Sequence, residues 1–178
     1  MKVIFLDVDG VLNSHQSATF WHSKRDQETW ETSMYKEWEG TIKEYIAREF
    51  CPIALSNTEE LVRQVPGVKI VVSSTWRLGE TVETLKKILY PAKLVADAII
   101  DVTPSFHRRN DAGEQMTRGH EIQDWLNRHP EVDKYVIIDD DSDMLDSQKE
   151  NFVKTSGFHG FQHLDMLWAL RILGEKYR

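Results

Sequence analysis

The sequence contains very little cysteine, since Cys51 is the only one among its 178 residues. A lone cysteine cannot form an internal disulfide. The first residues also lack the basic start, apolar middle and small-residue cleavage site of a secretory signal. We therefore expect a cytoplasmic protein. Long apolar runs are missing too: none approaches the roughly 18 residues of a membrane-spanning helix, so we expect no membrane span.

An excess of positive charge is missing as well. The chain has 22 Lys and Arg residues against 29 Asp and Glu residues, a net charge of −7. Tight nonspecific binding to nucleic acid needs a cationic surface, so this balance disfavours it, although it leaves room for a local basic patch. Neither a Walker-type phosphate loop nor a Gly-x-Gly-x-x-Gly fingerprint occurs, which removes support for nucleoside triphosphate and dinucleotide chemistry. The seven histidines show no zinc-ligand spacing with the lone cysteine.

What the sequence does contain is a set of apolar, β-branched runs that end in polar residues. Such runs predict buried strands. Three of them, Lys2 to Leu6, Val68 to Val72 and Tyr135 to Ile138, are followed at once by aspartates or hydroxyl residues. Further short strands are predicted at Leu94 to Ile100 and near Asn151 to Thr155.

Helical patterns lie between these runs, over Ile53 to Gln64, Gly79 to Leu89 and Gly119 to Arg128, and a closing helix is expected at Leu164 to Leu173. Alternating strands and helices predict an α/β fold, a Rossmann-like three-layer sandwich with a central parallel sheet. The length fits one domain over residues 1–178. In such folds the ligand site lies beyond the carboxyl ends of the strands.

Residues 14–50 interrupt the alternation, because they are polar and rich in tryptophan and glutamate. We interpret them as a small, mainly helical, cap-like insertion after the first strand, with a helix from about Ser33 to Phe50. An ordinary surface loop and helix is the alternative. Trp21, Trp30 and Trp38 would pack the core of the insertion or stack on a flat substrate.

Asp7 and Asp9 are two residues apart at the end of the first strand, so in extended backbone their side chains project to the same side. Gly10 then allows a sharp turn. A strand-to-turn junction with acidic turn residues is the alternative. The segment Phe5 to Leu12 resembles the first motif of haloacid dehalogenase (HAD)-type hydrolases. The resemblance implies that Asp7 attacks phosphorus to form an aspartyl-phosphate, and that Asp9 protonates the leaving oxygen and later activates water.

The second HAD motif is a serine or threonine at the end of the next core strand, and the segment Val71 to Arg77 resembles it. We favour Ser74 over Ser73 as the hydroxyl that holds the phosphoryl group; a helix N-cap is the alternative. The remaining substrate-binding candidates in these two motifs are Gly10, Ser73, Thr75 and Arg77.

The third motif is a lysine or arginine before a helix, and Thr117 to Ile122 offers Arg118. Lysine is the commoner occupant, and an arginine is not equivalent to it, although it can still neutralise phosphate and brace Asp7. Lys93 and Arg77 are the competitors for this role, and a solvated loop arginine is the other alternative.

The fourth motif is acidic, and Ile137 to Asp143 resembles it. The resemblance implies Mg²⁺ as cofactor, with Asp139 as a ligand together with Asp7 and the backbone carbonyl of Asp9, Asp140 as a supporting acid and Asp143 as an outer partner. A calcium-binding EF-hand loop is a rival interpretation for Asp139, Asp141, Asp143 and Glu150. It is disfavoured because Met144 replaces the required glycine and a strand pattern precedes the loop.

The four motifs occur in the family's order and predict a Mg²⁺-dependent phosphomonoesterase that works through an aspartyl-phosphate. Within the family, Ser-Ser-Thr-Trp-Arg and Arg-Gly-x-Glu-Ile followed by Trp-Leu resemble the phosphatase domains of bacterial and phage RNA-repair proteins. This implies nucleotides or phosphorylated nucleic-acid ends as substrates. A small organic phosphate as substrate, or a regulatory or binding protein without catalysis, are the alternatives. A phosphate-accepting receiver domain is disfavoured, because no aspartate ends the strand before Ser73.

Overall fold

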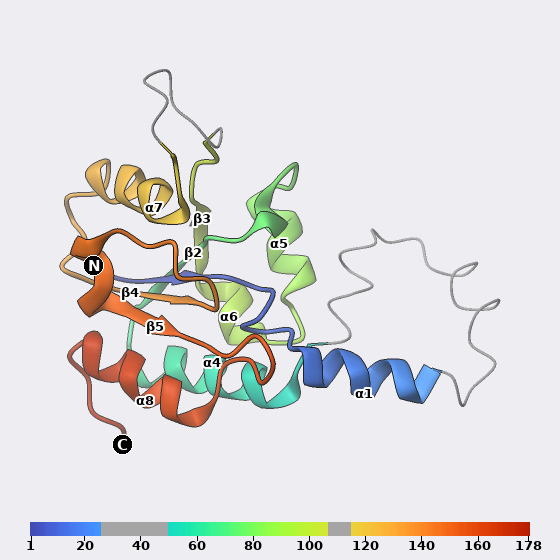
Figure 1. The fold of residues 1–178 in the computed structure, drawn as a ribbon. Helices are drawn as coiled ribbons and strands as arrows, with labels where there is room; N and C mark the ends of the chain where they lie inside the picture. Colours follow the sequence, from blue (N-terminus) through green and yellow to red (C-terminus); the bar gives the residue numbers. More distant parts are fainter. Residues whose placement is uncertain (26–49, 107–114) are drawn as a thin grey trace.

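The computed structural model describes residues 1–25, 50–106 and 115–178 of the chain. These residues form a five-stranded, entirely parallel sheet in the order β3-β2-β1-β4-β5 (Figure 1). The strands are β1 (Lys2–Leu6), β2 (Lys69–Val72), β3 (Ile99–Val102), β4 (Lys134–Asp139) and β5 (Phe152–Lys154). The predicted α/β fold with a central parallel sheet is confirmed.

The central strand β1 explains why the sequence shows continuous apolar runs. Ile4 and Leu6 point into a large core on one face of the sheet, whereas Val3 and Phe5 point into a smaller core on the other. A strand that is buried on both faces needs apolar residues at successive positions.

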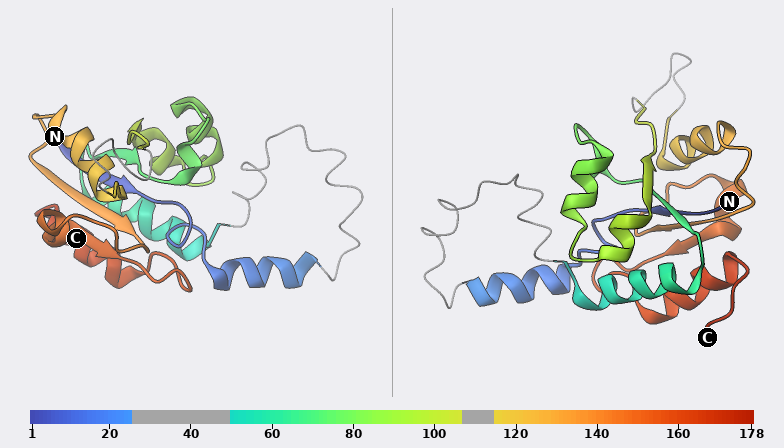
Figure 2. Two further views of the ribbon diagram at one scale, coloured as in Figure 1. Left: turned by 45° about the horizontal axis from the view of Figure 1, so that its top comes forward. Right: turned by 180° about the vertical axis from the view of Figure 1, so that it is seen from behind.

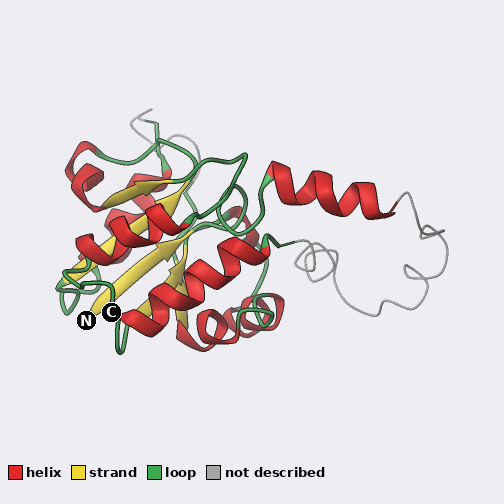
Figure 3. Ribbon diagram, turned by 90° about the horizontal axis from the view of Figure 1, so that it is seen from below, coloured by secondary structure: helices red, strands yellow, loops and turns green. Residues whose placement is uncertain are grey.

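Helices cover both faces, as a three-layer sandwich requires. Figures 1 and 3 show α4 and α8 side by side on one face, and Figure 1 shows α7 on the other, where Ile122 and Trp125 pack against Phe5. The helices are α1 (His15–Arg25), α4 (Pro52–Gln64), α5 (Val82–Ile88), α6 (Lys93–Ala98), α7 (Arg118–Asn127) and α8 (His163–Ile172), with 3₁₀ turns η2 (Thr75–Arg77) and η3 (Asp146–Asn151). None of these described helices is both long and apolar enough to cross a bilayer.

The strand predicted at Leu94 to Ile100 is wrong over most of its length, because residues 93–98 form helix α6 and the strand begins only at Ile99. The helix buries Val95, Ala96 and Ala98 and packs against α4. A short apolar run is compatible with either a buried helix or a strand. The next helix boundary also differs: the helix expected from Gly79 starts at Val82, because Thr81 caps it by accepting a hydrogen bond from the Thr84 amide at 3.1 Å.

Residues 14–50 are described only at their two ends. Helix α1 was not predicted; it starts where the backbone amide of His15 donates to the carbonyl of Gly157 at 3.0 Å, and it projects away from the sheet (Figures 1 and 2). Trp30, Trp38 and the helix expected from Ser33 lie outside the described residues, except for its last residue. The cap-like insertion and the single-domain boundary remain predictions.

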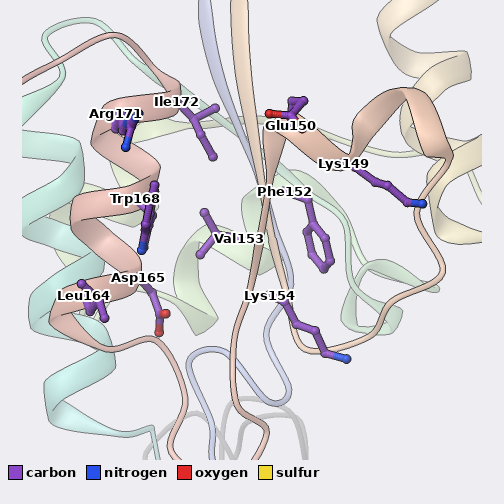
Figure 4. A pocket seen from close by; sticks show the side chains of 10 residues that line it. All are labelled: Lys149, Glu150, Phe152, Val153, Lys154, Leu164, Asp165, Trp168, Arg171 and Ile172. Atoms are coloured by element: carbon purple, nitrogen blue, oxygen red, sulfur yellow. The ribbon is translucent and has the colours of Figure 1, made fainter.

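A groove of about 610 Å³ lies at the open edge of the sheet, between β5 and α8. Figure 4 shows Val153 of β5 facing Trp168 and Ile172 of α8 across it, with Lys149 and Lys154 pointing away on the other side of the strand. None of the candidate site residues lines this groove.

Candidate active site

The carboxyl ends of three neighbouring strands bring the predicted polar residues together. β1 lies between β2 and β4, so Asp7 after β1 sits between Ser74 after β2 and Asp139 at the end of β4. One carboxylate oxygen from each of Asp7, Asp139 and Asp140 lies within 4.8 Å of the others. The structure thus assembles three of the four predicted metal-site aspartates into one cluster.

Burial controls the charge of this cluster. It raises the pKa of Asp7 to about 6, because its carboxylate loses water, and the nearby Arg118 and the hydrogen bond with Ser74 only partly oppose that rise. Burial also raises the pKa of Asp139 to about 8, with further help from the negative charge of Asp7. The buried site therefore favours the protonated form of both carboxyl groups unless a nearby cation takes the place of the protons.

Arg118 supplies the first such charge. Its Nη1 lies 3.4 Å from Oδ1 of Asp7 and 3.9 Å from Oδ2 of Asp139. Asp143 anchors this arginine at the start of α7, because its Oδ2 accepts the Arg118 backbone N–H at 3.1 Å. The competitor Lys93 is ion-paired with Asp97 on α6 at 2.7 Å. Of these two residues, Arg118 is therefore the one that the described fold brings to the acids.

The acid cluster has the donor set of a magnesium site. Within the described part of the chain, Oδ2 of Asp139 is buried and accepts no hydrogen bond, whereas its Oδ1 accepts from the backbone amide of Asp141 at 2.9 Å. A buried carboxylate oxygen without a donor is costly. A hard cation with oxygen ligands would satisfy it, and the oxygens of Asp7, Asp139 and Asp140 fit Mg²⁺.

Asp9 lies outside this three-carboxylate cluster. Asp9 is exposed, and its carboxylate accepts a hydrogen bond from the indole of Trp76 at 2.7 Å and another from Asn13 at 3.3 Å. The side chains of Asp7 and Asp9 therefore have different surroundings, one buried among acids and one facing the solvent side.

Two glycines fit closely around Asp140. Gly10 adopts φ +72°, and a Cβ at this position would overlap the Asp140 carboxyl group. A Cβ on Gly157 would lie 2.6 Å from Oδ2 of Asp140. Gly10 thus makes room for an acid rather than only for a turn. Gly157 was not among the sequence candidates, since nothing in its local sequence points to a strand end 17 residues away.

The two serines that follow β2, Ser73 and Ser74, have different partners in the structure. The Ser74 hydroxyl caps the 3₁₀ turn η2 by accepting the Trp76 backbone N–H at 3.4 Å, and Ser74 also lowers the pKa of Asp7, whereas the hydroxyl of Ser73 accepts a hydrogen bond from Thr103 at 3.5 Å. Ser74, which was expected as the alternative to be a helix N-cap, is therefore both a cap and a neighbour of Asp7.

Arg77 is buried and bonded within the protein. Its guanidinium donates to the backbone carbonyls of Ser74, Thr103 and Pro104 at 2.5–2.8 Å, and it is ion-paired with Glu121 of α7 at 2.7 Å. The predicted substrate-binding arginine therefore clamps the ends of β2 and β3 to α7.

Two hollows open beside the acids. One of about 410 Å³ lies between the acids and the start of α1, and one of about 560 Å³ lies between η2 and α7. Thr75 and Arg118 line both. A substrate bound at the acids therefore has room on either side of Arg118.

The EF-hand interpretation is wrong for the loop that begins at Asp139. The strand β4 precedes this loop and a 3₁₀ turn follows it, whereas an EF-hand has a helix on both sides. In addition, Asp139 faces Asp7 of another strand instead of its own loop.

Comparison with known families supports the same assignment. The family model described as the HAD domain in Swiss Army Knife RNA repair proteins matches residues 3–166, a stretch that includes all four motif segments. No curated protein and no solved structure matches the chain. Since the match spans nearly the whole chain and the sheet carries its acids where the HAD motifs predict them, the chain belongs to this family of HAD domains.

Proposed function

We propose that this HAD domain is a Mg²⁺-dependent phosphomonoesterase that uses Asp7 as its nucleophile. The observation that carries the proposal is the position of Asp7: a buried carboxylate with a hydroxyl, a guanidinium and two further acids around it. An acid that only capped a turn would not need these partners.

In the first step, a carboxylate oxygen of Asp7 attacks phosphorus and the bond from phosphorus to the leaving oxygen breaks. Asp9 gives its proton to that oxygen, so the product leaves as an alcohol. Ser74 and Arg118 orient and neutralise the phosphoryl oxygens, which is the main contribution that proteins make to this type of reaction.

In the second step, Asp9 takes a proton from water, which attacks the phosphorus of the aspartyl-phosphate and releases phosphate and the free Asp7 carboxylate. The two roles of Asp9 need contact with solvent, and its carboxylate is exposed. Asp7, Asp139 and Asp140 would hold Mg²⁺, with the Asp9 backbone carbonyl as a further candidate ligand. The cation supplies charge neutralisation for the phosphoryl group.

We further propose that the substrates are nucleotides or phosphorylated nucleic-acid ends. The description of the matching family, a domain in RNA repair proteins, supports this class, and the two hollows beside Arg118 offer room for a nucleoside next to the phosphate. A small organic phosphate is the second candidate. A HAD-fold binding protein without turnover is the third, and the completeness of the acid set argues against it.

The test is phosphate release from 5′- and 3′-phosphorylated oligonucleotides, mononucleotides and sugar phosphates, with Mg²⁺ and with chelator. We expect Mg²⁺-dependent turnover that is fastest with a nucleotide or an oligonucleotide end. Preference for a sugar phosphate would contradict the substrate class. Absence of release from every ester, or equal release from Asp7→Asn protein, would contradict the enzyme.

A further inference from the structure

The indole of Trp76 holds the exposed acid of the site. Its Nε1 donates a hydrogen bond to Oδ2 of Asp9 at 2.7 Å. Trp76 is 6% exposed, and its ring packs on Phe50, with ring centroids 5.8 Å apart. A tryptophan nitrogen can only donate. The fold thus fixes a buried donor against a carboxylate that otherwise faces solvent.

The two donors to Asp9 differ in what they constrain. Asn13 lies in the same loop as Asp9, and its Nδ2 reaches Oδ1 only at 3.3 Å. Trp76 comes from the end of β2, 67 residues along the chain, and makes the shorter contact. The contact with Trp76 therefore ties the Asp9 loop to the strand-end scaffold, whereas the contact with Asn13 moves with the loop.

One short segment thereby contacts both acids. Trp76 donates to Asp9, Ser74 lowers the pKa of Asp7, and Thr75 between them lines the cavity beside both. Residues directly after β2 therefore lie against both carboxylates. A substitution within residues 74–76 should therefore affect the catalytic step in which Asp7 and Asp9 act at the same time.

We infer that Trp76 is a positioning residue for proton transfer to the leaving group, an inference that rests on the proposed phosphomonoesterase. Oδ2 of Asp9 has the closer donor, at 2.7 Å against 3.3 Å for Oδ1, so the transferable proton sits on Oδ1. As the bond from phosphorus to the leaving oxygen breaks, that proton passes from Oδ1 to the leaving oxygen. In the second step Oδ1 takes a proton from the attacking water.

The first test uses the leaving group. Trp76→Phe keeps an aromatic ring on Phe50 and removes the N–H. With a nucleoside monophosphate, whose alkoxide must be protonated to leave, we expect kcat/KM, which covers the steps up to Asp7 phosphorylation, to fall at least about tenfold, a part of what general acid catalysis contributes. With 2,4-dinitrophenyl phosphate, whose leaving group needs little protonation, we expect less than about a twofold change in kcat/KM. In an Asp9→Asn background the same substitution should have no further effect on the nucleotide.

Trp125→Phe is the matched control. Trp125 also donates from Nε1 to an aspartate, Oδ2 of Asp101, at 2.7 Å, but it belongs to α7 and packs against Phe5 in the core between α7 and the sheet. We expect Trp125→Phe to leave unchanged the ratio of the rate with the nucleoside monophosphate to the rate with 2,4-dinitrophenyl phosphate. If Trp76→Phe slowed both esters equally, Trp76 would not act through leaving-group protonation. If its effect added fully to that of Asp9→Asn, it would not act through Asp9. Either result would overturn the positioning role and leave the proposed phosphomonoesterase standing. A wild-type protein that releases phosphate from neither ester would overturn the proposed function together with this inference.

A second test needs no turnover. In a ¹H–¹⁵N spectrum the indole signal of Trp76 is identified by its loss in Trp76→Phe. Asp9→Ala, a change at an exposed side chain, should shift that signal and leave the indole signal of Trp125 in place. An unmoved Trp76 signal would show that the contact does not exist in solution and would overturn the inference.

Discussion

At the scale of single residues, Asp7 and Asp9 make different predictions because one is buried in the acid cluster and the other is exposed. Asp7→Asn removes the nucleophile, so we expect phosphate release to fall at least about a thousandfold. Asp9→Asn slows leaving-group departure and hydrolysis, and we expect a phosphoenzyme to accumulate with an activated aryl phosphate. Mass spectrometry of acid-quenched protein measures it as a mass increase of one phosphoryl group. Accumulation in Asp7→Asn instead would reverse the assignment.

Gly10 gives a second prediction at this scale. Gly10 has φ +72° and Gly67 has φ +75°, so alanine strains either backbone by a similar amount, about 1 kcal/mol. Only at Gly10 does the new Cβ meet the Asp140 carboxyl group; at Gly67 no described atom lies within 4 Å of the new Cβ. We therefore expect Gly67→Ala to lose only the stability that the strained backbone costs, whereas Gly10→Ala loses more and also needs at least about tenfold more Mg²⁺ for half-maximal phosphate release.

Gly67→Ala is the control, because it carries the backbone strain without the contact. Equal Mg²⁺ requirements in the two variants would mean that Asp140 contributes nothing to the metal site.

The residues at the strand ends could be found from the sequence because each follows an apolar run directly, and the carboxyl ends of parallel strands meet. Asp7, Ser74 and Asp139 do lie together, and Arg118 joins them from the start of α7; their chemical roles stay predictions. The contacts of Trp76 and Gly157 could not be found, since both depend on a partner far away in the chain. Trp76 was visible beside the serine motif, but only the fold brings its indole to Asp9.

At the scale of secondary-structure elements, the strands β1, β2 and β4 were predicted to within about one residue, since each is buried on both faces. The short segment around Asp97 was not, because helix α6 and strand β3 follow one another without a turn residue between them. What decides between helix and strand there is packing of α6 against α4, which no local pattern records.

The clamp of Arg77 on three elements leads to a third prediction. Its ion pair with Glu121 is buried, with side-chain exposures of 5% and 12%. Arg77→Met leaves Glu121 as an unpaired buried charge, so we expect about 3–5 kcal/mol lower free energy of unfolding in urea. Because the clamp joins the β2 and β3 ends to α7, which carries Arg118, we also expect phosphate release to decline at a urea concentration where the protein is still folded.

Lys93→Met provides the comparison. Both partners of its ion pair with Asp97 are exposed to solvent, so the pair should contribute little to stability. The double variant Arg77→Met, Glu121→Gln should recover part of the lost stability, because it removes the uncompensated charge. If the free energy of unfolding fell by similar amounts in Arg77→Met and Lys93→Met, the buried ion pair would stabilise the fold no more than the exposed one.

At the scale of the whole molecule, the acid cluster links folding, pH and metal. Asp7 and Asp139 have an ordinary pKa of 3.8, and in the folded chain burial raises these to about 6 and about 8. Between pH 4 and pH 8 the folded state therefore holds protons that the unfolded state has released. The stability contributed by these two groups is complete below pH 4, falls as pH rises, and levels off above about pH 8.

Mg²⁺ should reverse this loss, since it binds the ionised carboxylates of the folded chain and competes with their protons. We expect Mg²⁺ to raise the thermal unfolding midpoint by at least about 2 °C at pH 8 and by much less at pH 5.

Without metal at pH 8, Asp139→Asn should unfold at a higher temperature than the wild type, because it removes a buried charge, and it should gain little from Mg²⁺. Measuring the unfolding midpoint of the wild type and of Asp139→Asn from pH 5 to pH 8 distinguishes the contribution of the acid cluster from that of other titrating groups. A Mg²⁺ effect that is equal at pH 5 and pH 8, or equal in Asp139→Asn, would mean that the cation binds elsewhere, and the strand-end acids would then need another explanation for their burial.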